Sequence, residues 1–187
     1  AVGKVVAGVI LQFTCATLAT ALVNQFVREP YMDEIFHVRQ TQAYCDGKFY
    51  DWDPKITTPP GLYLVAYTFA KLLAMVFGQD LSSSSIFCSL QALRWYNTLL
   101  SAACMVVTLT LLGHLHQVNK SSKTAPSDVF IHALCLCFFP PYFFFCSLYY
   151  TDVGSTAAVL LMLYLCRRRF IVASAFAGII SIHCGVC

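Results

Sequence analysis

The sequence predicts an all-α integral membrane protein, built as a single membrane domain over residues 1–187. Hydrophobic residues make up 58% of the chain and charged residues only 11%, and the mean hydropathy is +0.67. A soluble domain cannot bury so much apolar surface, so the bilayer is the natural solvent for this chain. Several segments also lack Asp, Glu, Lys and Arg over a length close to the ~20 residues that a helix needs to cross a bilayer.

We expect membrane spans at residues 5–27, 94–114, 129–148 and 153–166, and the start of another at 170–187. The length and polar end of the first segment favour a retained helix over a signal peptide. The fourth segment is short, but the arginines that follow it can snorkel to water. Pro140 and Pro141 predict a kink in the third span, because proline lacks a backbone donor. The chain stops inside an apolar stretch, so we expect it to be incomplete.

Residues 28–93 are expected to form one long loop between the first two spans, because ten of the 21 charged residues gather in its first half. Pro30 ends the first helix, and residues 33–43 have the pattern of a short amphipathic helix. The run Thr-Thr-Pro-Pro-Gly at 57–61 predicts a rigid loop that leads into a further helix.

That further helix, at residues 61–78, is apolar but carries Lys71 near its middle. A lysine at the centre of a span costs ~2.5 kcal/mol or more. The segment therefore either spans the membrane at this cost or lies at the interface, where the lysine reaches water.

Loop charges favour the interfacial position for this helix. With it on the outer surface, the cytosolic side receives Asp128 and the basic residues Lys4, Lys120, Lys123, Arg167, Arg168 and Arg169. The other eight of the nine acidic residues then lie on the outer side with six basic ones, as the positive-inside rule prefers. The glycosylation sequon at 119–121 would then be cytosolic and unmodified, and a glycan there would contradict this topology.

Most of the ten cysteines lie inside apolar segments, where they act as small apolar residues. Cys45 and Cys88 lie outside the expected spans, and a disulfide between them is possible but is not decided by the sequence. We expect neither a metal site nor a cofactor, because Cys135 and Cys137 point to different helix faces and the sequence has no P-loop, GxGxxG, HExxH or serine elbow.

Asp33 and Glu34 follow the first span closely, on the predicted outer side. A carboxylate at this depth suits a general base that acts on a hydroxyl brought to the interface. The alternative is an acidic start to the amphipathic helix, which the helix dipole favours. Asp152, flanked by Tyr150, lies on the same side and could share the site or simply cap the helix that follows.

Three cations on this side, Lys55, Lys71 and Arg94, suit a lipid phosphate, although ordinary interfacial anchoring explains them as well. His37 lies one turn after Asp33 and could orient it, whereas a packed or solvated histidine is the alternative. The loop also holds aromatic residues that could stack on sugar faces or form an interfacial belt, namely Tyr31, Phe36, Tyr44, Phe49, Tyr50 and Trp52.

Five stretches closely resemble one family: residues 29–37 (EPYMDEIFH), 42–45 (QAYC), 52–63 (WDPKITTPPGLY), 93–94 (LR) and 148–155 (LYYTDVGS). It is the family of endoplasmic-reticulum dolichyl-phosphate-glucose α-1,2-glucosyltransferases, and this chain is similar to its N-terminal portion. The resemblance implies a GT-C fold, a multi-pass protein of the endoplasmic-reticulum membrane with lumenal juxtamembrane helices and an active site in the first lumenal loop.

The resemblance also implies the chemistry. The substrates would be dolichyl-phosphate glucose and the dolichyl-diphosphate oligosaccharide, joined by an inverting transfer for protein N-glycosylation. Asp33 would be the general base and Glu34 its neighbour in the acidic motif. His37, Lys55, Lys71, Arg94, Tyr150 and Asp152 would bind substrate, the cations holding the donor phosphate.

The chain departs from the family in two ways: family members are much longer, and residues 182–187 do not look like the family's continuation. The alternative is therefore a truncated, non-catalytic membrane isoform that acts through partner interactions.

Overall fold

A computed structural model describes residues 2–118 and 126–184, and every regular element in these two ranges is a helix. In chain order they are α1 (Val2–Phe26), α2 (Glu34–Cys45), α3 (Gly61–Val76), the 3-10 helix η1 (Ile86–Cys88), α4 (Leu90–Val118), α5 (Pro126–Cys137), α6 (Pro140–Cys146), α7 (Thr151–Arg167) and α8 (Ile171–His183). The prediction of an all-α membrane protein is confirmed. The sequon at 119–121, which contains Lys120, and Lys123 lie outside the described residues.

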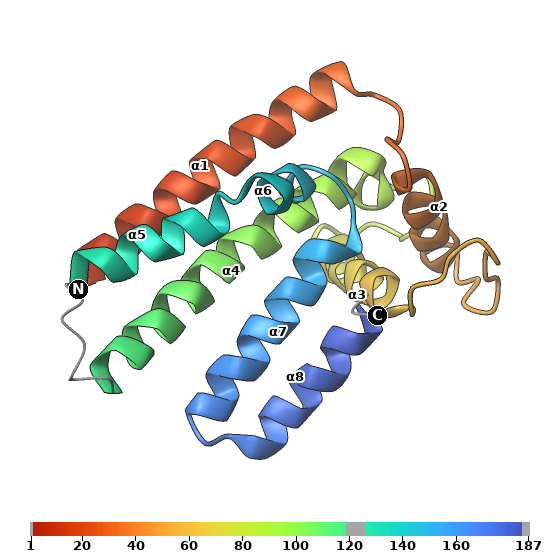
Figure 1. Cartoon of the computed structure of the whole chain (residues 1–187). Coiled ribbons are helices and arrows are strands. Elements are labelled where there is room, and N and C mark those ends of the chain that lie inside the picture. Colours follow the sequence, from red (N-terminus) through yellow and green to blue (C-terminus); the bar gives the residue numbers. More distant parts are fainter. Residues whose placement is uncertain (1, 119–125, 185–187) are drawn as a thin grey trace.

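Among the described residues, helices α1 and α4 are each long and apolar enough to cross a membrane, and the bent pair α5–α6 gives a third such span if its two helices are counted as one. Helix α4 lies at the centre, where it packs against α1, α5 and α7, while α7 and α8 form a helical hairpin. Figure 1 shows α2 and α3 gathered at one end of these helices, beside the start of α7. The residues predicted to act on substrate lie at this end.

The predicted kink is present as a break of 61° between α5 and α6. Pro140 begins α6, where its missing N–H is not needed by the helix. The same prolines could not continue α5, because a proline ring clashes with the carbonyl one turn earlier.

Helix α3 buries one narrow face and leaves the other open. Its buried positions repeat about once per turn and are Leu62, Tyr63, Ala66, Ala70 and Ala74, whereas Lys71 is exposed and lies 5.6 Å from the Tyr67 ring. In Figure 1 it is seen nearly along its axis, while α4 and α7 run across the view. This crossing direction suits a helix that lies along a membrane surface, although its side of the membrane remains a prediction.

Hydrogen bonding and close packing tie this end to the spanning helices. The hydroxyls of Thr41 on α2 and Tyr149 before α7 lie 2.8 Å apart, and both residues are fully buried. At the start of α3, a Cβ on Gly61 would overlap the backbone carbonyl of His183 at the end of α8. Glycine is therefore required at position 61 for α8 to pack there.

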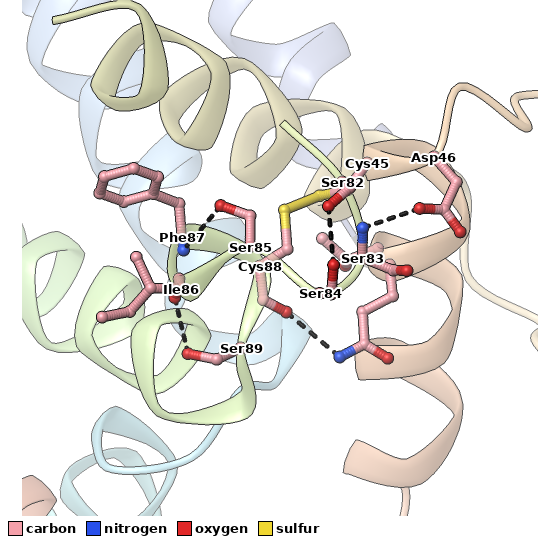
Figure 2. Close-up of a disulfide and its surroundings, with 12 residues drawn as sticks. Cys45, Asp46, Ser82, Ser83, Ser84, Ser85, Ile86, Phe87, Cys88 and Ser89 are labelled. Carbon is pink, nitrogen blue, oxygen red and sulfur yellow. Dashed lines mark hydrogen bonds between the residues drawn. A yellow bond between two sulfur atoms is a disulfide. The ribbon is translucent and has the colours of Figure 1, made fainter. Parts of the chain in front are cut away.

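Figure 2 shows a disulfide between Cys45, at the end of α2, and Cys88 of η1, 43 residues later. Two polar contacts accompany it. The backbone N–H of Ser83 donates to Asp46 Oδ1 (2.7 Å), and Gln42 Nε2 donates to the carbonyl of Cys88 (3.2 Å). The bridge, which the sequence left undecided, fastens the far end of the long loop to α2.

Removing this cross-link should lower the stability of the folded protein. The Cys45→Ser/Cys88→Ser variant is expected to lose about 4 kcal/mol, because the bridge restricts a 43-residue loop in the unfolded chain. Thermal unfolding in detergent measures the loss, with the exposed thiol variant Cys135→Ser as the control. Full maleimide labelling of Cys45 and Cys88 before reduction would contradict the pairing.

Candidate active site

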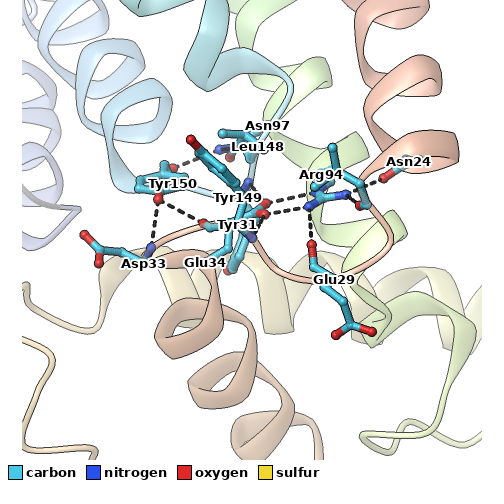
Figure 3. A network of polar contacts seen from close by, with 11 residues as sticks. Asn24, Glu29, Tyr31, Asp33, Glu34, Arg94, Asn97, Leu148, Tyr149 and Tyr150 are labelled. Atoms are coloured by element: carbon cyan, nitrogen blue, oxygen red, sulfur yellow. Dashed lines mark hydrogen bonds and ion pairs between the residues drawn. The ribbon is translucent and has the colours of Figure 1, made fainter.

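The centre of the site is a buried ion pair between Glu34 of α2 and Arg94 of α4. Both side chains are fully buried. Arg94 Nη2 lies 2.6 Å from Glu34 Oε2, and Arg94 Nε lies 3.0 Å from Glu34 Oε1. Figure 3 shows the two-pronged contact, the geometry in which a guanidinium binds a carboxylate most strongly.

The remaining hydrogen-bonding groups of this pair are also occupied. The backbone N–H groups of Tyr31 and Tyr149 donate to the Glu34 carboxylate at 2.9 and 2.6 Å. The Arg94 guanidinium donates to the carbonyl of Val27 (2.7 Å) and to Asn24 Oδ1 and the carbonyl of Glu29 (both 3.3 Å). The pair therefore holds together the end of α1, the turn before α2, α4 and the segment that leads into α7.

A second set of contacts fixes Asp33 itself. Tyr150 accepts a hydrogen bond from the Asp33 backbone N–H (2.9 Å), and its hydroxyl donates to the carbonyl of Tyr31 (3.1 Å). Asn97 Nδ2 in turn donates to the carbonyls of Leu148 and Tyr150, both at 2.8 Å. The Asp33 backbone is thus pinned by the entry to α7, as Figure 3 shows.

The turn that presents Asp33 is strained. Met32 has a φ of +50°, in the left-handed region that residues other than glycine rarely adopt. Such a conformation costs about 1–3 kcal/mol and is common beside functional sites. Asp33 follows at the N-cap position of α2, but its side chain makes no capping hydrogen bond. Its exposed carboxylate is thus not used to start the helix.

A cavity of about 360 Å³ opens beside this carboxylate. It brings together five of the eight residues that the sequence singled out, namely Asp33, His37, Lys55, Tyr150 and Asp152. They come from the N-cap and first turn of α2, from the loop before α3, and from the N-cap and first turn of α7. The alternative that Asp152 caps α7 is wrong, because Tyr150 is the cap and Asp152 lies in the first turn. Asp152 is exposed at the cavity instead.

His37 forms a nearly closed part of the cavity wall, with only 8% of its surface exposed. Its Nδ1 lies 2.8 Å from the hydroxyl of Tyr63, which is itself fully buried. Burial lowers the pKa of His37, although the nearby carboxylates of Asp33, Asp152 and Glu34 oppose the shift. The imidazole is therefore neutral at neutral pH, with one nitrogen held by Tyr63.

The other three predicted residues lie outside the cavity. Glu34 and Arg94 are committed to their buried pair, and Lys71 lies on the exposed face of α3. Their predicted roles in binding or catalysis are not tested by this placement. Lys55, which does line the cavity, has its Nζ 5.6 Å from the centre of the Phe36 ring. In residues 2–118 and 126–184, no group of three or more His, Cys, Asp and Glu residues is placed to hold a metal ion.

Sequence reasoning missed several residues that build the site. Thr57, Thr58 and Phe145 line the cavity, and Asn97 holds its frame. The two threonines belong to the predicted rigid loop, so their position beside Pro59 was a usable signal. No local signal marks Phe145 or Asn97, because the break at Pro140 and the packing of α4 bring them to the site.

Breaking the ion pair should destabilise the protein strongly. Arg94→Met leaves the Glu34 carboxylate buried without its countercharge, and we expect a loss of about 3–5 kcal/mol. Chemical denaturation in detergent measures this loss. Lys71→Met serves as the control, because Lys71 is exposed and lies outside the network. Equal stability of the two variants would contradict the central role of the pair.

Protonation of His37 should destabilise the folded state in acid. Its pKa is lowered from 6.5 on folding, so the unfolded chain binds more protons below that pH. The contribution of the neutral His37 to the free energy of unfolding is therefore complete above pH 6.5. This contribution is lost as the pH falls below that value. Unfolding of wild type and His37→Gln, measured at about pH 7.5 and about pH 5, should show the larger acid loss in wild type. Equal losses would contradict the burial of a neutral His37.

Comparison with known proteins shows which family the chain is similar to. The model of the DIE2/ALG10 family matches residues 27–184. Relatives named Dol-P-Glc:Glc(2)Man(9)GlcNAc(2)-PP-Dol alpha-1,2-glucosyltransferase include one from Arabidopsis thaliana, 42% identical over 86% of this chain, and a human one, 38% identical over 89%. A third, from Neurospora crassa, is 38% identical over 82%. No solved structure matches the chain.

The chain is much shorter than these relatives. The match covers 31% of the Arabidopsis protein, 34% of the human protein and 19% of the Neurospora protein. The matched residues include the whole of the cavity and the buried ion pair. This chain belongs to the DIE2/ALG10 family.

Proposed function

We propose that this chain carries the catalytic loop of a glucosyltransferase in the endoplasmic-reticulum membrane. The enzyme would move glucose from dolichyl-phosphate glucose to the lipid-linked oligosaccharide and form an α-1,2 bond with inversion. The observation that supports this proposal is that one cavity at the end of the membrane helices is lined by Asp33, His37, Lys55, Tyr150 and Asp152. Membership of a family whose named relatives bear this activity supports the same conclusion.

In this mechanism Asp33 is the general base. Its carboxylate takes the proton from the acceptor's 2-hydroxyl while the hydroxyl oxygen bonds to the anomeric carbon of the donor glucose. The bond from that carbon to the phosphate oxygen breaks, and its electron pair leaves with the phosphate. A single displacement of this kind inverts the anomeric centre and needs only one base. The Asp33 carboxylate meets this need, because it is exposed and makes no capping hydrogen bond to α2.

Lys55 is the cation best placed for the leaving phosphate, because it lines the same cavity as Asp33. A charge-assisted hydrogen bond from its ammonium group would stabilise the negative charge that grows on the phosphate. Lys71 lies on the exposed face of α3 and does not line this cavity. Arg94 already binds a carboxylate and three further oxygens, so we assign it, with Glu34, to positioning Asp33 rather than to binding phosphate.

Asp152, His37 and Tyr150 complete the proposed binding of sugar hydroxyls. A carboxylate accepts hydrogen bonds from two adjacent hydroxyls, and a neutral imidazole can donate or accept one. The Tyr63 hydroxyl fixes one nitrogen of His37 (2.8 Å), which leaves the other ring nitrogen for a ligand. The cavity therefore offers both acceptors and donors around the base.

The Cys45–Cys88 disulfide supports the lumenal position of this loop. Disulfides persist in the oxidising lumen of the endoplasmic reticulum and are rare in the cytosol. The distribution of basic residues assigns the loop to the same side. We therefore place α2, α3 and the cavity at the lumenal surface, with α1 running toward it from the cytosol.

Replacing the base should abolish transfer without unfolding the protein. In the full-length protein, expressed in cells that lack their own enzyme, Asp33→Asn is expected to lower addition of the third glucose by about 10²–10⁴-fold. Mass analysis of lipid-linked oligosaccharides measures the product. Asp80→Asn is the matched control, because it removes an exposed acid away from the cavity.

Restoration of the third glucose by Asp33→Asn would overturn the assignment of the base. Failure of the wild-type full-length protein to restore it would overturn the proposed activity. The 187-residue chain should be assayed alongside, because its failure beside an active full-length protein would favour the alternative of a non-catalytic membrane isoform.

A further inference from the structure

A second cavity, of about 450 Å³, lies next to the first. Its walls are one face of α2 and the loop that follows, and its lining includes Arg39, Gln40, Asp51, Trp52, Asp53 and Lys55. Lys55 lines both cavities. A ligand that extends past this lysine would therefore occupy the two cavities together.

The loop wall of the second cavity is held in shape by one buried side chain. Gln40 is only 3% exposed, and its amide reaches the loop at two points. Its Nε2 donates to the carbonyl of Asp51 (2.6 Å), and its Oε1 accepts from the backbone N–H of Asp53 (3.1 Å). The carboxylate of Asp53 then accepts from the backbone N–H of Lys55 (3.0 Å). The wall is thus preorganised, which lowers the entropic cost of binding.

Trp52 gives this wall an aromatic surface that is 40% exposed. Its ring packs edge-on against the buried Tyr63, with the ring centres 5.8 Å apart, so the indole is supported from behind. The negative face of an aromatic ring attracts the weakly positive C–H groups on one side of a pyranose. The adjacent Tyr50 is fully exposed and lines neither cavity.

The charges around the second cavity balance one another. Arg39 and Lys55 contribute two positive charges, and Asp51 and Asp53 contribute two negative ones. A phosphate would gain little net attraction from this set, whereas a sugar uses both signs, because each hydroxyl donates to a carboxylate or accepts from a cation. The lining therefore favours an uncharged polyhydroxyl ligand over an anion.

We infer that the second cavity is a subsite for an uncharged hexose of the acceptor oligosaccharide. This hexose lies next to the terminal sugar, whose hydroxyl reaches Asp33 across Lys55. The inference rests on the proposed function for the identity of the oligosaccharide. It adds Trp52 and Gln40 as residues that select the acceptor, Trp52 by contact and Gln40 by holding the loop.

Binding can be tested by fluorescence, because the chain has only two tryptophans, Trp52 and Trp95. The Trp95→Phe chain in detergent, with Trp52 as its sole indole, is titrated with free Glc2Man9GlcNAc2 glycan. A saturable change in emission is expected, with no change in the matched Trp52→Phe chain. No change in the first protein, or the same change in both, overturns the inference. So does an equal response of Trp52 to inorganic phosphate.

Kinetics of the full-length enzyme give a second, independent test. Trp52→Ala is expected to raise the KM for the acceptor about 10-fold and leave kcat and the donor KM unchanged, because the lost contact binds the ground state and the transition state equally. Tyr50→Ala, which removes a neighbouring aromatic outside both cavities, should change none of these constants. Gln40→Leu should raise the acceptor KM in the same way by releasing the loop.

The outcomes separate this inference from the proposed function. An unchanged acceptor KM for Trp52→Ala in an active enzyme overturns the subsite alone, and so does a rise in the donor KM instead. Glycan binding at Trp52 in a protein that transfers no glucose supports the subsite and overturns the activity alone.

Discussion

Two opposite charges that are fully removed from water must be satisfied on every side, and this requirement organises the end of the molecule that holds the site. Glu34 and Arg94 meet it by drawing backbone groups from α1, from the turn after it and from the entry to α7. Each segment then has little freedom to move. The Glu34–Arg94 ion pair thereby fixes the position of Asp33, one residue before Glu34, although the Asp33 carboxylate takes no part in it.

The site thereby divides its acidic residues between two kinds of work. Glu34 is fully buried, and its carboxylate accepts hydrogen bonds from Arg94 and from two backbone N–H groups. Asp33 and Asp152, in contrast, are exposed at a cavity. The same division applies to the cations, because Arg94 is buried and Lys55 lines the cavity. Rigid, buried support beneath an accessible carboxylate is the arrangement expected of a preorganised catalytic site.

Much of this could be predicted from the sequence, because the relevant signals are local. Runs without charge marked α1, α4 and the pair α5–α6, Pro140 marked the break, and an acidic pair after a span marked the cavity. The pairing of Glu34 with Arg94 could not be predicted, because 60 residues separate them and each had a plausible role of its own. Only the packed fold distinguishes a carboxylate that contacts a cavity from its neighbour that does not.

The order in which the partners of Glu34 leave the ribosome bears on how the protein is assembled. Arg94 follows Glu34 by 60 residues, and Tyr149 follows it by 115. Until both have been delivered to the same side of the membrane, the carboxylate has to stay hydrated, since burying it alone is prohibitively costly. Helix α2 therefore settles against the spans only after α4 and the start of α7 are in place, so the site is assembled later than the order of its first residues in the chain suggests.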